Sequence, residues 1–417
     1  MTSREKVLAA LNHIDSGFIP VDLSGHRSSG ISAIAYNNLR KYLNLEPKTV
    51  KVYDMVQQLA IVDDDVLELF GVDTIELGRA FLNDERDWKP WILPDGTDCL
   101  IPFFVNVEKN GNDWLLLDNN GLEVGIQKQG CLYFEQTYFP LSERDYATDL
   151  FTDLEQQIGN QMWSAVPHPG AHFPLDKAGL KTLADKAKIL REITEKAIIG
   201  IFGGNMFEIP NMLFRMDNYM LNMAMYPEET LKFSEKLCGI HLKNLEKWLT
   251  AVGPYIDIVL FGDDLGGQSS ALISPEMYRE FYKPFHKKLW TRAKELADVK
   301  VMLHCCGSVK ILLNDMIEAG LDAINPVQVS CNNMDPEELK KEFGHRITFW
   351  GGGCDTQYVL PHENEQSVYK HVMEQINVLK QNGGFVFQTV HNIMANVPPQ
   401  NILAVFQAVK DFNLKIK

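Results

Sequence analysis

The sequence predicts a (β/α)₈ barrel, in which eight parallel strands close on themselves and helices surround them. Eight short apolar runs end in glycine, aspartate or another polar residue, and helix-like patterns follow them. The runs lack clean alternation of polar and apolar residues, which is typical of parallel strands covered on both faces. Eight strands that alternate with helices are the number that such a barrel needs. The predicted strands are 18–23, 71–77, 198–204, 257–264, 299–307, 322–328, 347–353 and 384–391.

Long amphipathic patterns between these runs predict the helices. Residues 227–252 and 275–297 both open with Pro-Glu, which suits the first turn of a helix. Residues 363–383 end at a pair of glycines, which suits a helix C-cap. The last pattern, 398–412, predicts a C-terminal helix that closes the barrel.

Residues 85–145 interrupt this alternation of strands and helices. Aromatic-rich strand patterns are separated there by Asp-Gly and Asn-Gly pairs, which favour tight hairpin turns. We therefore predict a β-hairpin insertion after the second strand of one barrel domain that spans 1–417. The alternative interpretation is that the segment forms a separate small β domain.

The composition excludes several classes of protein. Of the 417 residues, 45% are hydrophobic and 23% are charged, as in soluble globular enzymes. The net charge of −15 argues against nucleic acid or an anionic membrane as the main partner, because both attract basic surfaces. No segment approaches the roughly 20 consecutive apolar residues that a membrane-spanning helix needs.

The cysteines and the first residues indicate a cytoplasmic protein. The start of the chain has the pattern of an amphipathic helix, with Thr2 or Ser3 as its cap, and lacks the apolar core of a signal peptide. The number of cysteines is odd and their spacing is uneven, so reduced thiols are expected. The cysteines are Cys99, Cys131, Cys238, Cys305, Cys306, Cys331 and Cys354.

Chemically unusual residues gather at the ends of the predicted strands. In a (β/α)₈ barrel the carboxyl ends of the strands form the active-site face, so we expect these residues to share one rim. In chain order they are His26 with Arg27, Arg79, Asn205 with Glu208, Asp263 with Asp264, His304 with Cys305 and Cys306, Gln328, Cys354 with Asp355, and His391 with Asn392.

His304 and Cys306 form the clearest metal-binding pattern. Zinc prefers imidazole and thiolate ligands in a tetrahedral arrangement. Residues i and i+2 of a strand point to the same side, so His304 and Cys306 can face one ion while Cys305 points away. Cys354 is the predicted third ligand, and His391 is the alternative. The competing interpretation is that the two adjacent cysteines pack in the core beside a hydrogen-bonded histidine.

The remaining polar residues at the rim are assigned to catalysis or to substrate binding. Asp263 or Glu208 could transfer a proton, and either could supply an oxygen ligand to the metal, as could Gln328. An aspartate at this position could equally cap the following helix. His26 and Arg27 could bind an anionic group of the substrate or belong to a surface loop. The residues assigned to substrate binding are His26, Arg27, Arg79, Gln328 and Asp355.

Several of these stretches resemble the uroporphyrinogen decarboxylase superfamily, and the resemblance extends over nearly the whole chain. It implies a (β/α)₈ barrel with its site at the strand carboxyl ends. The superfamily divides into cofactor-free porphyrinogen decarboxylases and zinc-dependent methyltransferases of corrinoid systems. The stretches that carry the resemblance are SREKVLAALNH (3–13), DDLGGQSSALISPEMYREFYKP (263–284), HCCGS (304–308), ITFWGGGCDTQ (347–357) and GFVFQTVHNIMANVPPQNILA (384–404).

Two departures from the family patterns favour the methyltransferase branch. The decarboxylases carry an RQAGR-type motif after the first strand to bind propionates, whereas this chain has DLSGHRSSG with Arg27 alone. The methyltransferases carry His-x-Cys on the fifth strand and a later cysteine, which His304, Cys306 and Cys354 match. In the relatives that act on methylated thiols the late cysteine lies on the eighth strand, where this chain has His391. The sequence is most similar to the methoxyarene O-demethylating methyltransferases.

This resemblance implies a reaction, two cofactors and a partner. The reaction is zinc-dependent transfer of a methyl group from a methoxylated aromatic compound to the cobalt of a corrinoid protein. The cofactors are Zn²⁺ and a corrinoid (cobalamin) carried by that partner protein, and the resemblance is compatible with a homodimer. The alternatives are a methylcobamide:thiol (coenzyme M) methyltransferase, a metal-free uroporphyrinogen decarboxylase, and a zinc- or corrinoid-binding module without chemistry.

Overall fold

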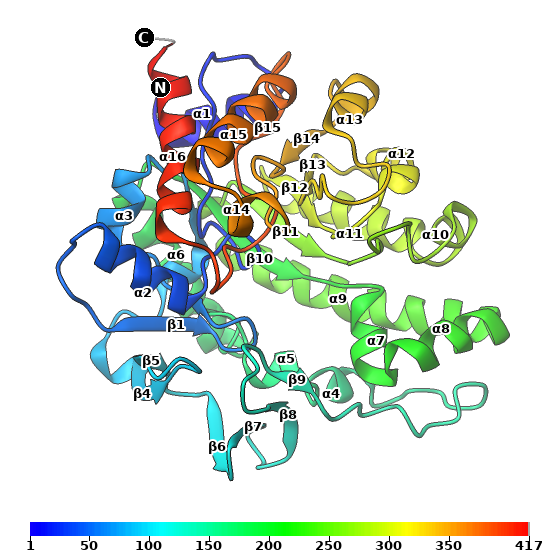
Figure 1. The fold of residues 1–417 in the computed structure, drawn as a ribbon. Helices are drawn as coiled ribbons and strands as arrows, with labels where there is room; N and C mark the ends of the chain where they lie inside the picture. The colour runs from blue at the N-terminus through cyan, green and yellow to red at the C-terminus, as the bar shows by residue number, and fades with distance from the viewer. Residues whose placement is uncertain (416–417) are drawn as a thin grey trace.

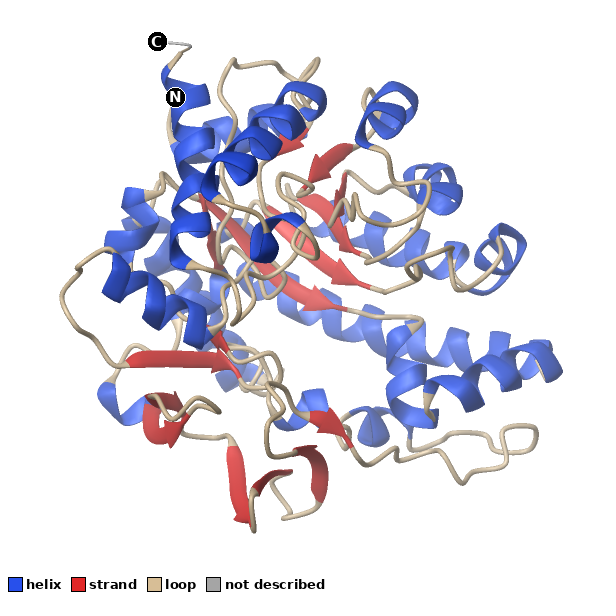
Figure 2. Cartoon of the chain, in the orientation of Figure 1, coloured by secondary structure: helices blue, strands red, loops and turns tan. Residues whose placement is uncertain are grey.

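A computed structural model describes residues 1–415, and at its centre lies a curved parallel sheet of seven strands (Figure 1). These strands confirm the second to eighth predicted strands, and helices flank them on the outside (Figure 2). Neighbours in the sheet are also neighbours in sequence order, as in a (β/α)₈ barrel. The strands are β3 (Thr74–Glu76), β10 (Ala197–Gly203), β11 (Ile258–Gly262), β12 (Lys300–His304), β13 (Ala323–Asn325), β14 (Thr348–Trp350) and β15 (Phe385–Val386).

The first predicted strand, 18–23, is reduced to an isolated parallel bridge between Val21 and Phe387. The N–H of Asp22 donates to the carbonyl of Phe387 at 2.8 Å, and the N–H of Asp73 donates to the carbonyl of Val21 at 2.8 Å. This segment therefore joins the two edges of the sheet. Pro20 has no N–H, and the N–H of Val21 donates to the side chain of Asp73, so a continuous ladder cannot form.

Helix α1 (Ser3–Leu11) closes the amino-terminal end of the barrel. Thr2 caps it in a reciprocal capping box with Glu5, which confirms the predicted start. Apolar residues of α1 pack against alternate residues of the strands, which point inward together because of the two-residue period. This interior cluster is Val7, Ala10, Leu11, Ala197, Ile199, Ile258, Leu260, Met302, Ala323, Trp350 and Val386.

The predicted C-terminal helix forms as α16 (Pro399–Leu414). It packs on the outside against α15 (Glu365–Leu379) and α2 (Ala33–Tyr42), with Phe406 stacked on Phe70 at 4.2 Å between ring centroids. It thus lies in the outer ring of helices between the last and the first parts of the barrel, whereas α1 fills the amino-terminal end of the sheet.

The other helices follow the predicted patterns with one break. The predicted helix 227–252 is α9 (Pro227–Val252). The predicted helix 275–297 divides at Tyr282 into α10 (Pro275–Phe281) and α11 (Lys283–Leu296), because Pro284 has no N–H to continue the first helix. The remaining helices of four or more residues are α3 (Asp64–Leu69), α4 (Leu154–Ile158), α5 (Met162–Ala165), α6 (Lys177–Ile193), α7 (Glu208–Phe214), α8 (Met216–Met225), α12 (Lys310–Ala319), α13 (Pro336–Phe343) and α14 (Val359–His362), with the 3₁₀ turn η1 (Leu77–Ala80). Across residues 1–415, no helix is both long and apolar enough to span a membrane.

Two small sheets lie outside the barrel. One has the order β2 (Leu59–Ala60), β1 (Val50–Asp54), β5 (Asp98–Pro102), β4 (Trp88–Ile92), and the other is a meander of β6 (Asn106–Asn110), β7 (Asp113–Leu117), β8 (Glu123–Gln127) and β9 (Glu135–Gln136). The antiparallel pairs β4–β5 and β6–β7 turn at Gly96 and Gly111, both at positive φ, as the turn pairs predicted. Sequence analysis missed β1 and β2, because β1 is completed by a parallel partner, β5, more than 40 residues later.

Candidate active site at the barrel mouth

The carboxyl ends of β10, β11 and β12 open into a cavity of about 340 Å³. Its apolar wall comes from the strand ends and from α5, whereas its polar groups come from loops that follow several different strands. The loop after β1 and the segment around α5 also reach this cavity, so elements outside the barrel complete it. The lining residues that matter below are Arg27, Gln57, Trp163, His168, Asn205, Glu208, Asp264, His304 and His391.

Three potential metal ligands meet at one side of this mouth. Donor atoms of His304, Cys306 and His391 all lie within 4.8 Å of one another, and no other such group of three occurs in the described part of the chain. Nε2 of His304 lies 3.3 Å from Sγ of Cys306, so the two side chains share one side of the strand end. Cys305 faces the core instead, where its Sγ accepts the N–H of Leu265 at 3.3 Å.

Cys354, the predicted third ligand, does not join this group. Its side chain is fully buried, and Sγ faces the carbonyl of Asp355 at 3.8 Å. Gly351 and Gly352 adopt positive φ after β14, so the chain turns before it reaches Cys354. His391, the alternative ligand, lies beside His304 with 5.5 Å between the ring centroids.

The donor set of His304, Cys306 and His391 fits zinc. A tetrahedral ion with bonds of about 2.0–2.3 Å holds its ligand atoms roughly 3.5 Å apart, close to the 3.3 Å between the His304 and Cys306 donors. Nδ1 of His304 lies 2.8 Å from Oδ1 of Asn325, whose amide donates to the carbonyl of Trp350 and to Gln388. This orientation makes Oδ1 the acceptor and Nδ1 the donor, which leaves the Nε2 lone pair available for a metal.

Burial controls the protonation of all three groups. It lowers the pKa of His304, and it lowers the pKa of His391 to about 3, so both rings are neutral. Burial also raises the pKa of the Cys306 thiol, and the nearby carboxylate of Asp264 raises it further. A cation bound here would therefore displace the thiol proton.

Asp264, and not Asp263, faces the cavity. Oδ1 of Asp264 accepts the N–H of Cys306 at 2.7 Å and lies 3.8 Å from Nε2 of His304. Asp263 is fully buried, where it accepts backbone N–H groups at the start of α7 and contacts His286. Asp263, which the sequence analysis assigned to proton transfer, therefore does not reach the cavity, because its carboxylate is buried as a cap of α7.

Glu208 lies half-buried in the cavity wall. Burial raises its pKa well above the usual value, and the nearby carboxylates of Asp264 and Asp263 raise it further. Nδ2 of Asn205 donates to its Oε2 at 2.5 Å, which orients the carboxyl group. The raised pKa of Glu208 favours its protonated form, and its carboxyl group lines the cavity.

Arg27 provides a positive group in the cavity wall. Its Nε donates to the buried carboxylate of Asp54 at 2.6 Å, and its guanidinium lies over the Trp163 ring at 4.9 Å from the centroid. Its buried Nη2 has no hydrogen-bond partner within residues 1–415. Burial and the Arg27 charge lower the pKa of His168, a further lining residue, to about 3. Sequence analysis did not select His168 because a histidine in a Pro/Gly loop carries no distinctive pattern.

The other four residues assigned to substrate binding lie away from this cavity. His26 is buried and contacts Asp22 at 3.3 Å, Gln328 accepts the N–H of Gly307 at 2.8 Å, and Asp355 accepts the N–H groups of Gln357 and Tyr358. Each of these side chains therefore holds a loop of the barrel.

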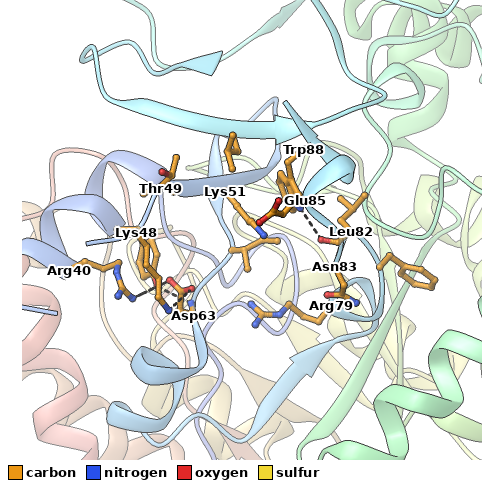
Figure 3. Close-up of a pocket in the computed structure, with 15 residues that line it drawn as sticks. Arg40, Lys48, Thr49, Lys51, Asp63, Arg79, Leu82, Asn83, Glu85 and Trp88 are labelled. Atoms are coloured by element: carbon orange, nitrogen blue, oxygen red, sulfur yellow. Dashed lines mark hydrogen bonds and ion pairs between the residues drawn. The ribbon is translucent and has the colours of Figure 1, made fainter. Parts of the chain in front are cut away.

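The fourth of them, Arg79, lines a different cavity of about 710 Å³ (Figure 3). Its Nη1 donates to the carbonyl of Val62 at 2.6 Å. Arg40 and Lys48 in the same cavity both pair with Asp63, at 3.1 and 3.3 Å. These three cationic groups are thus engaged by the chain's own acceptors, and Lys51 lies over the Trp88 ring at 5.0 Å from its centroid.

Glu76 makes the protein's stability depend on pH. Burial raises the pKa of Glu76 to about 8, from 4.5 for the free side chain. Between these values the unfolded chain releases a proton that the folded chain keeps, so stability should fall as pH rises from about 5 to 8. The variant Glu76→Gln should escape this loss and gain on the order of 1 kcal/mol per pH unit relative to the unsubstituted protein. Urea unfolding from pH 5 to 9 measures the difference, and parallel stability curves would contradict it.

The fold is a parallel barrel whose mouth brings the side chains of His304, Cys306 and His391 together. Residues 169–412 match the sequence profile of the uroporphyrinogen decarboxylase (URO-D) family, and the chain belongs to that family. A uroporphyrinogen decarboxylase of Chlorobaculum tepidum is 24% identical over 146 residues, which cover 35% of this chain and 40% of that protein. A methylated-thiol–coenzyme M methyltransferase of Methanosarcina mazei is 28% identical over 143 residues, 34% of this chain and 35% of that protein.

These curated relatives are thus matched over less than half of their own length. A solved structure, a methyltransferase from Methanosarcina mazei, aligns over 99% of both chains with a TM-score of 0.58 at 15% identity. This likeness shows that the two chains share a fold.

Proposed function

We propose that this protein is a zinc-dependent methyltransferase that moves a methyl group from a methoxylated aromatic compound to the cobalt of a corrinoid protein. The observation that carries the proposal is the group of His304, Cys306 and His391, which lies at the same cavity as the carboxylic acid of Glu208. The M. mazei relative, which is named as a methyltransferase, supports the reaction class. Arg27 is the one arginine in the DLSGHRSSG segment after the first predicted strand, where the decarboxylases carry an RQAGR-type motif that binds propionates.

The cavity suits a small aromatic substrate. Its volume of about 340 Å³ lies in the range of small-molecule sites, and its wall includes Trp163, Phe202 and Phe261. Arg27 lies over Trp163 in the cavity wall, where its positive charge favours a carboxylate on the ring. A methoxybenzoate is therefore a suitable first substrate.

In the proposed reaction, one group of residues would hold the metal and Glu208 would supply the proton. A zinc ion held by His304, Cys306 and His391 would supply Lewis-acid polarisation of the ether oxygen. The bond between the methyl carbon and this oxygen breaks with its electron pair going to the oxygen, while the methyl group bonds to the Co(I) of the carrier. Glu208 gives its proton to the departing phenolate, and water then restores the proton to Glu208.

The proposed reaction needs a reduced corrinoid, and the cysteines are consistent with a reducing compartment such as the cytoplasm. All seven fall within the described residues, and all are free thiols. Proteins of oxidising compartments usually pair their cysteines.

Turnover with a defined pair of substrates tests the proposal. Purified protein, a reduced corrinoid carrier and a methoxybenzoate should yield methyl-Co(III) and the free phenol in equal amounts. Treatment with a chelator should abolish this turnover, and added zinc should restore it without a change in the circular dichroism spectrum. Turnover that persists without metal would contradict the zinc-dependent reaction.

A second candidate is methyl transfer between methylcobamide and a thiol, which the name of the M. mazei relative favours. In that case methylcobalamin should lose its methyl group to coenzyme M, and methoxyarenes should not react. Formation of coproporphyrinogen by metal-free protein would instead identify a decarboxylase.

A further inference from the structure

A buried chain of three polar side chains leads from α10 and α11 to the edge of the site. The hydroxyl of Tyr278 lies 3.0 Å from Nδ1 of His286, and Nε2 of His286 lies 2.8 Å from Oδ2 of Asp263. All three side chains are buried, and none of them lines the mouth cavity. These three side chains can therefore affect the site only through a group that lies between them and the cavity.

That intermediary is the backbone at the start of α7. Oδ2 of Asp263 accepts the N–H of Met206 at 2.8 Å, and Oδ1 accepts those of Phe207 and Glu208 at 2.8 and 2.9 Å. Phe207, the N-cap residue of α7, offers no side-chain cap of its own. Asp263 at the end of β11 thus supplies the cap that the local sequence lacks, and it ties this turn to the barrel.

The carboxylate of Asp263 is itself held in one orientation by His286. Since the Tyr278 hydroxyl can donate to Nδ1, the ring proton lies on Nε2 and points at Asp263. The His286 ring is stacked on Trp290, with 4.8 Å between centroids and 12° between planes. The ring is therefore fixed on one face and at both nitrogens.

We infer that Tyr278 and His286 are positioning residues that hold Glu208 at the cavity wall through Asp263 and the first turn of α7. This inference rests on the proposed function, in which Glu208 is the proton donor. A general acid must lie within hydrogen-bond reach of the atom that it protonates, so a small shift of this turn lowers the rate of chemistry more than it lowers substrate binding.

Two substitutions at His286 separate positioning from simple packing. His286→Leu removes the donor to Asp263, whereas His286→Gln can present an amide N–H near the position of Nε2. The leucine variant should lower kcat by about tenfold or more, but by no more than the roughly 10²–10⁴-fold that a general acid contributes, and it should leave KM and zinc content unchanged. The glutamine variant should recover most of that loss. Tyr278→Phe, which keeps the ring, should lower kcat by a smaller factor.

Tyr36→Phe is the matched control. Like Tyr278→Phe, it removes one buried hydroxyl group. This hydroxyl lies on α2, outside the mouth cavity, and donates to the carboxylate of Asp63 at 2.6 Å. It should lower thermal stability without lowering kcat. If His286→Leu lowers kcat no more than this control does, or if His286→Gln behaves like His286→Leu, the inference is overturned.

An infrared measurement tests the inference without turnover. The carboxyl stretching band of Glu208, whether that of the acid or of the carboxylate, is identified as the band that disappears in Glu208→Gln. His286→Leu should shift or remove this band, and His286→Gln and Tyr36→Phe should retain it. If the protein transfers no methyl group to any carrier, the proposed reaction fails while this band still reports whether His286 positions Glu208. An unchanged band in His286→Leu would contradict the positioning role alone.

Discussion

The variant His391→Ala should lose most of its zinc on purification, whereas Cys354→Ala should keep it. The donor atom of His391 lies within 4.8 Å of those of His304 and Cys306, and Sγ of Cys354 faces a backbone carbonyl in the core. Loss of a direct ligand should weaken zinc binding at least as much as the roughly 10–100-fold that is typical for loss of a second-shell partner. Elemental analysis and competition with a chromogenic chelator measure the effect.

The adjacent cysteines provide the internal control for this experiment. Cys306→Ser should lose metal, and Cys305→Ser should not, because the Cys305 side chain points into the core. Zinc that persists in His391→Ala but is lost in Cys354→Ala would place the third ligand after β14. Retention in every variant would exclude the metal site.

The variant Glu208→Gln should lower kcat for methyl transfer by about 10²–10⁴-fold, which is the usual contribution of a general acid. Glutamine preserves the shape of the side chain and the contact with Asn205, but it cannot give a proton to the departing phenolate. Zinc content and KM should change little, because Glu208 is not among the three grouped ligands. Steady-state kinetics with a methoxybenzoate and reduced carrier give both constants.

The loss of kcat in Glu208→Gln should also depend on the acidity of the phenol that leaves. A more acidic phenol departs more readily as an anion, so the loss in Glu208→Gln should shrink as electron-withdrawing substituents are added to the ring. Glu246→Gln, at an exposed glutamate of α9 paired with Arg292, is the control and should match the unsubstituted protein. A loss that is the same for all phenols would remove Glu208 from the role of proton donor.

Much of the barrel could be predicted from the sequence because its strands are short, buried and apolar. Seven of the eight predicted strands form, and α9 has the predicted bounds. The sequence did not show that the first predicted strand would shrink to a single bridge, or that α1 would fill the open end of the sheet. Val21 gives its N–H to the side chain of Asp73, and α1 rather than α16 reaches the open end of the sheet. Both outcomes depend on contacts between segments far apart in the chain.

The candidate site divides in the same way. The alternation of side chains along a strand is a local property, so the sequence alone determined that His304 and Cys306 would face one side and Cys305 the other. The choice between Cys354 and His391 depended on how two separate loops turn after β14 and β15. Only the tertiary structure separates the two residues: the positive φ of Gly351 and Gly352 directs Cys354 into the core, whereas His391 lies beside His304.

The roles of Asp263 and Asp264 and the lining of the cavity also could not be predicted from the sequence alone. The sequence placed Asp263 and Asp264 at a strand end, but the backbone N–H groups of α7 decided which carboxylate is buried as a cap and which faces the mouth. Trp163 and Gln57 reach the cavity from segments outside the barrel strands. Sequence patterns report the local period of a strand or helix, whereas a site at a barrel mouth is assembled from loops whose paths are set by packing against distant segments.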